Sequence, residues 1–275
     1  MKNSIHIVSC NFNEEIEWLS KSPYPVHFVS KNGKEKKFEN VDFPLSVDFV
    51  PNTALEVTSY LFYIIKYYNE LPDKIAFIHG HENSYHQKVP IFESIEKNKL
   101  SDFADLNQYV HSRTIILKES IYFHLWNYFF EEPVPLYLDF KYGAQFLVSK
   151  EKIKTRTKDF YENLYDKLIN CNFLLMKKGF INTLINPGHK NPYIQNQQIM
   201  TLFMYILEQE ENFYSKIYGQ FFEAVWHLIF NSQCTLIDGY RKNFDTSPKK
   251  NFEIQEVYEN LESFEKKLKE LKNEI

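Results

Sequence analysis

The chain has 275 residues, 44% of them hydrophobic, and a net charge of −4, so it is long enough to bury a substantial core. Its basic residues are dispersed, which gives no electrostatic signature of nucleic-acid binding. The three cysteines, Cys10, Cys171 and Cys234, are widely spaced and predict neither a disulfide framework nor a thiolate zinc site. Residues 1–10 lack the apolar core of a signal peptide, and no run reaches the roughly 20 apolar residues of a membrane span. We therefore expect a cytoplasmic protein with reduced thiols.

The first part of the chain alternates short apolar runs with helical patterns. Strands are predicted around Ile5–Val8, Pro25–Lys31, Leu45–Val50 and Lys74–His79, with a short helix carrying Trp18 and Leu19 after the first. A longer helix is predicted to begin at a cap on Asn52 or Thr53 and to end at Pro72. Because strand, helix and strand follow one another at this spacing, we predict an α/β fold with a mostly parallel central sheet flanked by helices.

The second part is less regular. Helices are predicted at Lys118–Glu131, Lys158–Asn170, Ile194–Gln209 and Phe213–Phe230, and Tyr142–Lys150 is predicted as a turn that enters a strand. After residue 250, apolar residues recur at alternating spacings of three and four, from Ile254 to Ile275. This heptad pattern predicts either a coiled coil that joins two or three chains, or one amphipathic helix packed on its own domain. We divide the chain into a domain over residues 1–240 and a helical tail over residues 250–275.

Three histidines stand together in "FIHGHENSYH" (Phe77–His86). His79 and His81 lie two residues apart at a strand end and so point the same way, and His86 can return to them if the next turn closes. Three imidazoles form a site for zinc or another first-row metal with an open position for water, and Glu82 is a further candidate ligand or base. This set is one hypothesis for a metal-dependent hydrolase. The alternative is that these side chains make ordinary hydrogen bonds in a loop.

A carboxylate interrupts the aromatic run "GQFFEAVWHLIF" at Glu223. Glu223 and His227 lie at i and i+4, on one side of the predicted helix, with Trp226 adjacent. A carboxylate among so many aromatic rings is desolvated, which raises its pKa and suits a general base. The alternative is an exposed Glu223 paired with His227.

Polar residues follow the first strand, at Asn11, Asn13 and Glu14. In open α/β sheets ligands bind outside the carboxyl ends of the strands, and the histidines occupy the same edge if both strands are parallel in one sheet. The chain contains no P-loop, GxGxxG, GxSxG or HExxH motif.

Four segments, taken together, resemble a functionally undefined family grouped with nucleotide-sugar transferases of the GT-A type. They are "VSCNFNEEIEWL", "VPNTALEVTSYLFYIIKYYNELPDKIAFIHGHENSYH", "YGAQFLVSKEKI" and "FFEAVWHLIF". They carry an Asn-x-x-x-Glu helix ending in Leu-Pro-Asp, a His-Gly-His turn, Ala-Gln-Phe-x-Val-Ser and Glu-x-x-Trp. Tyr85 stands where the family usually has Trp.

The resemblance implies a GT-A-like fold and a donor site at the His-Gly-His turn. His79, Gly80 and His81 occupy the place of the Asp-x-Asp motif, where they would either hold a divalent metal, Mn or Zn, or contact the diphosphate without metal. Glu223 takes the place of the base that deprotonates an acceptor hydroxyl in an inverting transfer. The other residues implied in nucleotide-sugar binding are Asn11, Asn13, Glu14, Lys31 (as a phosphate contact), Asn52, Glu56, His86, Gln145 and Trp226.

The function expected from the sequence is glycosyl transfer from a nucleotide-diphosphate donor to a glycan, lipid-linked glycan or protein hydroxyl, in glycan biosynthesis. Peripheral membrane association and homo-oligomer formation through the tail are left open. Two rivals remain: the histidine-based hydrolase, and a non-enzymatic glycan- or partner-binding module on the same fold.

Overall fold

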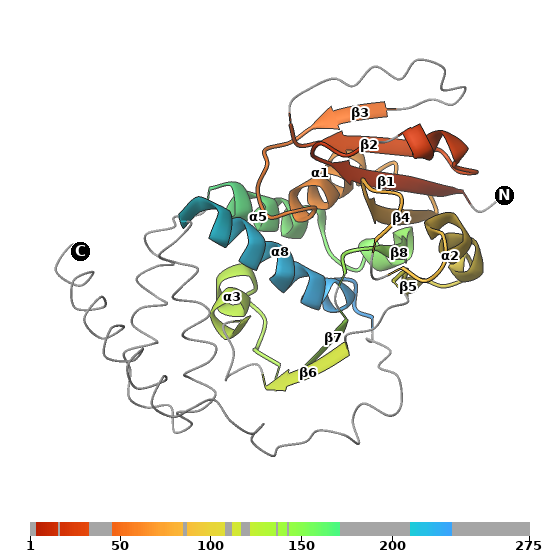
Figure 1. The fold of residues 1–275 in the computed structure, drawn as a ribbon. Coiled ribbons are helices and arrows are strands. Elements are labelled where there is room, and N and C mark those ends of the chain that lie inside the picture. The colour runs from red at the N-terminus through yellow and green to blue at the C-terminus, as the bar shows by residue number, and fades with distance from the viewer. Residues whose placement is uncertain are drawn as a thin grey trace, which may run out of the picture.

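The computed structural model describes residues 4–15, 17–32, 46–84, 87–107, 112–116, 122–135, 137–141, 143–170 and 210–232. Its central sheet has six strands in the order β3-β2-β1-β4-β8-β5 (Figure 1). β3, β2, β1 and β4 are mutually parallel, whereas β8 runs antiparallel to both β4 and β5. The strand bounds are β1 (Ile5–Asn11), β2 (Val26–Ser30), β3 (Ser46–Phe49), β4 (Lys74–His79), β5 (Phe103–Asp105) and β8 (Phe146–Ser149). The α/β class with a mostly parallel sheet is confirmed.

Helices cover both faces of this sheet, and a separate two-stranded sheet lies beside helix α8. The helices are η1 (Glu17–Lys21), α1 (Val57–Tyr67), α2 (Ile91–Asn98), α3 (Tyr122–Phe129), α4 (Lys150–Ile153), α5 (Lys158–Ile169) and α8 (Glu210–Ile229). The small sheet pairs β6 (Ser112–Ile116) with β7 (Tyr137–Lys141) in antiparallel register.

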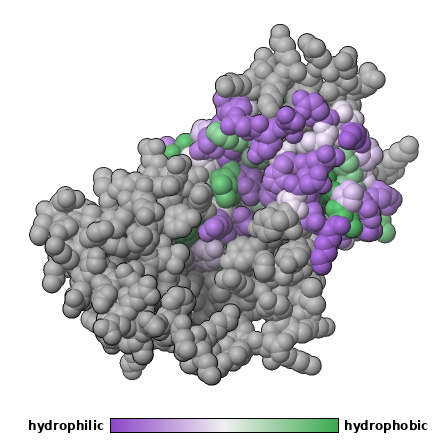
Figure 2. Space-filling model, in the orientation of Figure 1, coloured by the Kyte–Doolittle hydropathy of each residue, from purple (hydrophilic) through white to green (hydrophobic). Residues whose placement is uncertain are grey.

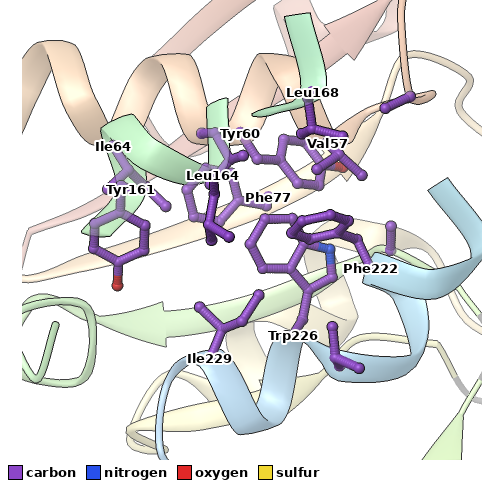
Figure 3. Packing of buried hydrophobic residues seen from close by; sticks show 14 of the residues in the cluster. Val57, Tyr60, Ile64, Phe77, Tyr161, Leu164, Leu168, Phe222, Trp226 and Ile229 are labelled. Carbon is purple, nitrogen blue, oxygen red and sulfur yellow. The ribbon is translucent and has the colours of Figure 1, made fainter. Parts of the chain in front are cut away.

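Two apolar clusters explain how the helices are held. On one face, η1 and α2 pack against alternate residues of the strands, including Ile7, Phe28 and Ile78. On the other face, α1, α3, α5 and α8 cover the neighbours of those residues, with aromatic side chains predominating. Figure 3 shows side chains from α1, β4, α5 and α8 meeting in this second cluster, where Tyr60 and Phe77 have ring centroids 4.8 Å apart. Many aromatic residues of the sequence therefore pack in the hydrophobic core.

The start of helix α1 differs from the prediction. The cap on Asn52 or Thr53 is wrong, because α1 begins at Val57 and Glu56 occupies the N-cap position without a side-chain capping bond. The reason is the backbone just before it: Ala54 and Leu55 have φ angles of 53° and 50°, in the left-handed region that ends a right-handed helix. The helix ends at Tyr67 with Tyr68 as its C-cap, shortly before Pro72, where its end was predicted.

Several predictions fall partly or wholly outside the described residues. The helix at Ile194–Gln209 and the tail over residues 250–275 lie there, together with Tyr85 and His86. Among the described helices, none combines the length and the apolar character that crossing a membrane requires. Figure 2 shows mostly hydrophilic residues on the described surface in its view, with only small hydrophobic areas between them.

Candidate active site at the carboxyl edge of the sheet

The order of the strands places a topological switch point between β1 and β4. The chain leaves β1 toward β2 on one side, while β4 lies on the other side of β1. Cys10 pairs with His79 in the parallel ladder, so Asn11 and Gly80 follow at the same edge. In open α/β sheets, ligands bind in the crevice outside the strand ends at such a point. The two sequence segments singled out for chemistry thus meet at the position where this fold class binds ligands.

The close packing of the backbone at this edge requires glycine at position 80. A Cβ on Gly80 would lie 2.8 Å from the Asn11 Nδ2 atom and 2.8 Å from the Cys10 carbonyl oxygen. The Trp18 indole donates a hydrogen bond to the Gly80 carbonyl at 3.0 Å, and Asn11 Nδ2 donates to the Glu14 carbonyl at 2.9 Å. The buried Oδ1 atom of Asn11 has no hydrogen-bond partner within the described part of the chain. Asn11 therefore presents an acceptor at the switch point.

A buried ion pair follows β4. The Nε2 atom of His79 lies 3.4 Å from the Oε1 atom of Glu56, and the two side chains are 14% and 13% exposed. Burial alone lowers the pKa of His79, but the Glu56 carboxylate outweighs it and the pKa is raised. Burial likewise raises the pKa of Glu56, yet the interaction with His79 prevails and lowers it. Each group thus favours the charged form of the other, an imidazolium beside a carboxylate.

Glu223 completes a trio of ionisable groups. Its Oε2 atom accepts a hydrogen bond from the backbone N–H of Gly143 at 2.9 Å. Burial first, and then the negative charge of Glu56, raise the pKa of Glu223 to about 7. The desolvation expected from the aromatic sequence context is thus present. A carboxyl group with this pKa exchanges a proton near neutral pH, as a general acid or base must.

An amide network holds the loop that carries Gly143. Gln145 Oε1 accepts from the backbone N–H of His79 at 3.1 Å, and Gln145 Nε2 donates to Asn107 Oδ1 at 3.0 Å. Asn107 Nδ2 in turn donates to Asp105 Oδ1 at 3.0 Å. Gln145 was expected to contact a nucleotide sugar; the structure places it 2% exposed, joining β4 to the Gly143 loop.

Several other candidates have structural partners. Glu14 Oε2 accepts from the backbone N–H groups of Phe12 and Asn13 at 2.7 and 3.1 Å, which stabilises the loop after β1. Lys31, expected to contact phosphate, is 6% exposed and donates to the carbonyl oxygens of Thr53 (2.6 Å) and Leu55.

Two further candidates differ in their exposure. Asn52 is exposed, in the segment that precedes the left-handed turn. Trp226 is 2% exposed and packs on Phe146, Phe222 and Phe230, so its ring belongs to the core. The ring of Trp226 therefore offers no surface for a ligand, whereas the side chain of Asn52 is open to solvent.

Two of the three histidines of the predicted cluster are described by the structure. His79 and His81 do lie together, with ring centroids 5.0 Å apart, and burial lowers the pKa of His81. Within the described residues, no group of three or more His, Cys, Asp or Glu side chains has the arrangement of a metal site. His86, the third member of the predicted set, lies outside those residues.

Three residues, Gly143, Asn107 and Tyr60, were not identified as part of the site from the sequence. Gly143 has a φ of 110°, which only glycine adopts readily, and Asn107 packs against it. Tyr60, one turn after Glu56, has a buried hydroxyl without a hydrogen-bond partner in the described part of the chain. Burial and the nearby Glu56, Cys10 and Glu223 hold the pKa of Tyr60 far above its ordinary value.

Replacing Gly143 by alanine is expected to destabilise the protein, on the order of 1–3 kcal/mol. The new Cβ would meet Asn107 Nδ2 at 2.5 Å, and the φ of 110° disfavours any side chain. Chemical denaturation measures the loss. As a control, the cost of Gly143→Ala is measured again in an Asn107→Gly background, where it should be smaller because the overlap is absent and only the backbone strain remains. Full stability in Gly143→Ala alone would contradict this geometry.

Comparison with known proteins places the chain in a family. Residues 7–114 and 104–185 match the family described as "Protein of unknown function (DUF3431)", and the two matches together span more than half of the sequence. The chain belongs to the DUF3431 family. No curated protein sequence matches the chain significantly. The DUF3431 match contains Glu56, His79 and Gly143 but ends before α8, so it does not include Glu223.

Proposed function

We propose that this DUF3431 protein is a glycosyltransferase with a GT-A-like fold, which moves a sugar from a nucleoside-diphosphate donor to a hydroxyl acceptor. The observation that supports this most is the carboxyl group of Glu223. Its pKa is raised to about 7, and the same edge of the sheet carries the Glu56–His79 ion pair. A base that is half ionised near neutral pH, beside a buried cation, fits a reaction that takes a proton from a hydroxyl and releases an anion.

The reaction balances with these groups alone. Glu223 accepts the proton of the acceptor hydroxyl as its oxygen forms a bond to the anomeric carbon. The bond from that carbon to the diphosphate oxygen breaks, and the diphosphate leaves with the electron pair. The positive charge of His79 would stabilise the developing charge on the leaving group. Attack opposite the leaving group inverts the anomeric configuration. In the alternative with a metal, neutral imidazoles of His79 and His81 would hold a divalent cation, which would supply that positive charge in place of the imidazolium.

A thermal-shift panel tests the donor half of the proposal. The panel contains UDP, GDP, CDP, dTDP and CMP, each with and without manganese. We expect one nucleoside diphosphate to raise the melting temperature, because a ligand that binds only the folded state stabilises it by about 2.7 kcal/mol at a hundred times its Kd. The same shift in Glu223→Gln would separate donor binding from proton transfer. A shift that needs manganese and disappears in His79→Ala makes the histidines metal ligands; a metal-independent shift makes them phosphate contacts.

If no nucleotide of the panel changes the melting temperature, the transferase proposal is wrong. If zinc then copurified with the protein, and phosphate or acyl esters were hydrolysed without any nucleotide, the histidine-based hydrolase would replace it. Silence with no zinc, and a biological effect that survives replacement of both Glu223 and His81, would favour the binding module.

A further inference from the structure

Glu56 directly follows a strained turn, which positions its side chain in the site. Ala54 and Leu55 are consecutive non-glycine residues in the left-handed region, with φ angles of 53° and 50°. Side chains disfavour this region, so two such residues in a row persist only where their surroundings impose them. Glu56 follows directly and places its carboxylate 3.4 Å from His79. Any relaxation of the turn would therefore move the Glu56 backbone and its side chain.

The ammonium group of Lys31 makes two polar contacts with this turn. From the end of β2 it reaches the carbonyl oxygen of Thr53 at 2.6 Å and that of Leu55 as well, so it binds both ends of the turn at once. Thr58 in α1 donates a further hydrogen bond to the Thr53 carbonyl at 2.8 Å. Lys31 is only 6% exposed, which makes an unpaired ammonium there costly. The two carbonyls accept hydrogen bonds from two of its three N–H groups.

Helix α8 also contacts this turn. Gly219 leaves room for the Leu55 side chain, since a Cβ at Gly219 would lie 2.4 Å from Leu55 Cδ1. Glu223 is one helical turn further along α8, on the same side as Gly219. The turn that Lys31 contacts therefore also packs against α8, beside the apolar contacts between α1 and α8.

We propose that Lys31 is a positioning residue, whose buried ammonium holds the Thr53–Leu55 turn in its left-handed conformation and keeps Glu56 against His79. The role differs from the phosphate contact expected from the sequence, because both carbonyl contacts face the protein. It rests on the proposed function only in treating Glu56, His79 and Glu223 as the reacting centre. The geometric claim can be tested without any substrate.

Lys74 provides a matched control. It is 7% exposed, and its ammonium donates to the Ser101 carbonyl at 2.7 Å. It stands at the first residue of β4, whereas His79 is the last. Replacing either lysine by methionine removes one buried ammonium and its backbone contacts, but only Lys31 touches the turn. Loss of stability is expected in both variants and does not distinguish them.

The deciding measurement is methyl NMR of the full chain with labelled alanine and leucine side chains, supported by crystal structures. In Lys31→Met the signals of Ala54 and Leu55 should shift, and the crystal structure should show Glu56 separated from His79. In Lys74→Met both signals and the ion pair should stay as in the unmodified protein. If Lys31→Met does not fold, Thr58→Val removes the neighbouring bond to the same carbonyl without changing charge, and should shift the same two signals.

Unchanged Ala54 and Leu55 signals in a folded Lys31→Met, with the Glu56–His79 contact intact, would overturn the proposal. Weaker binding of UDP in that variant would then identify Lys31 as a phosphate ligand. Failure of the proposed function would give a different result. If the turn signals shift but the unmodified protein binds no nucleotide, the positioning role of Lys31 is supported and the transferase proposal is wrong.

Discussion

Glu223→Gln should lower turnover roughly 10²–10⁴-fold, the usual contribution of a positioned general base. Glutamine keeps the shape of the side chain and an oxygen that can accept from the Gly143 N–H, but it cannot take a proton. Donor binding should therefore be retained while transfer is lost. Steady-state kinetics with the nucleotide sugar identified by the panel measures the change.

The same replacement should stabilise the protein at alkaline pH. The pKa of Glu223 is raised from an ordinary value of 4.5 to about 7, so the folded state holds this proton more tightly than the unfolded chain does. Its contribution to stability is thus lost as pH rises from 4.5 through 7, where a buried carboxylate must ionise. Glutamine never ionises, and Glu223→Gln should unfold at higher denaturant concentration than the unmodified protein at pH 8.

These opposite changes in activity and stability separate a functional carboxylate from a structural one. Glu162→Gln, which removes an exposed carboxylate paired with Lys158 at 3.1 Å on α5, is a suitable control and should alter neither quantity appreciably. In the unmodified protein, turnover should rise with pH through about 7 as Glu223 loses its proton. Undiminished transfer in Glu223→Gln would remove this residue from the mechanism.

Glu56→Gln should cost on the order of 3–5 kcal/mol of stability, because it leaves a buried imidazolium without its counter-charge. The loss depends on pH in a defined way. The pKa of Glu56 is lowered from 4.5, so its contribution is lost as pH falls through the folded value. The pKa of His79 is raised from 6.5, so its contribution is lost as pH rises through the folded value. The difference from the unmodified protein is therefore largest between about 4.5 and 6.5, and urea denaturation at pH 5.5 and at pH 9 measures it.

A second effect of Glu56→Gln should appear in catalysis. The charge of Glu56 helps to raise the pKa of Glu223, so without it that pKa should fall and the rising limb of the pH–rate profile should move to lower pH. Asp48→Asn is the control, since it breaks another histidine–carboxylate pair, with His27 at 2.9 Å, on β2 and β3. That variant should lose stability and keep its pH–rate profile. An unshifted profile in Glu56→Gln would contradict the coupling of the two carboxylates.

The elements best predicted from the sequence are those with strong local patterns. β4 coincides with its predicted range, and α5 was bounded within one residue, because Thr157 caps its first turn with a bond to the Phe160 N–H at 3.2 Å. The start of α1 was misplaced because a left-handed turn made of Ala54 and Leu55 carries no glycine to announce it. The antiparallel direction of β8 and its place between β4 and β5 depend on long-range pairing, which local patterns do not encode.

The residues of the site show the same difference between local patterns and long-range contacts. Asn11, His79 and Glu223 were recognisable because polar residues beside apolar runs are unusual at strand ends and in aromatic helices. Their partners were not, since Gly143 and Asn107 act through backbone geometry and a contact between distant segments. Lys31 and Trp226 were chosen for chemistry, and the structure gives each a packing partner inside the protein.

The trio of Glu56, His79 and Glu223 is assembled from segments far apart along the chain, and α8 is the last described helix to contribute. Joining distant segments requires closing long loops, which slows their association relative to local structure. During synthesis, the strands and helix that carry Glu56 and His79 emerge from the ribosome well before Glu223 does. A growing chain therefore holds the Glu56–His79 ion pair before Glu223 is present at that edge of the sheet. Under the proposed function, transfer would require α8 to dock first, so activity would begin only once the chain is complete through that helix.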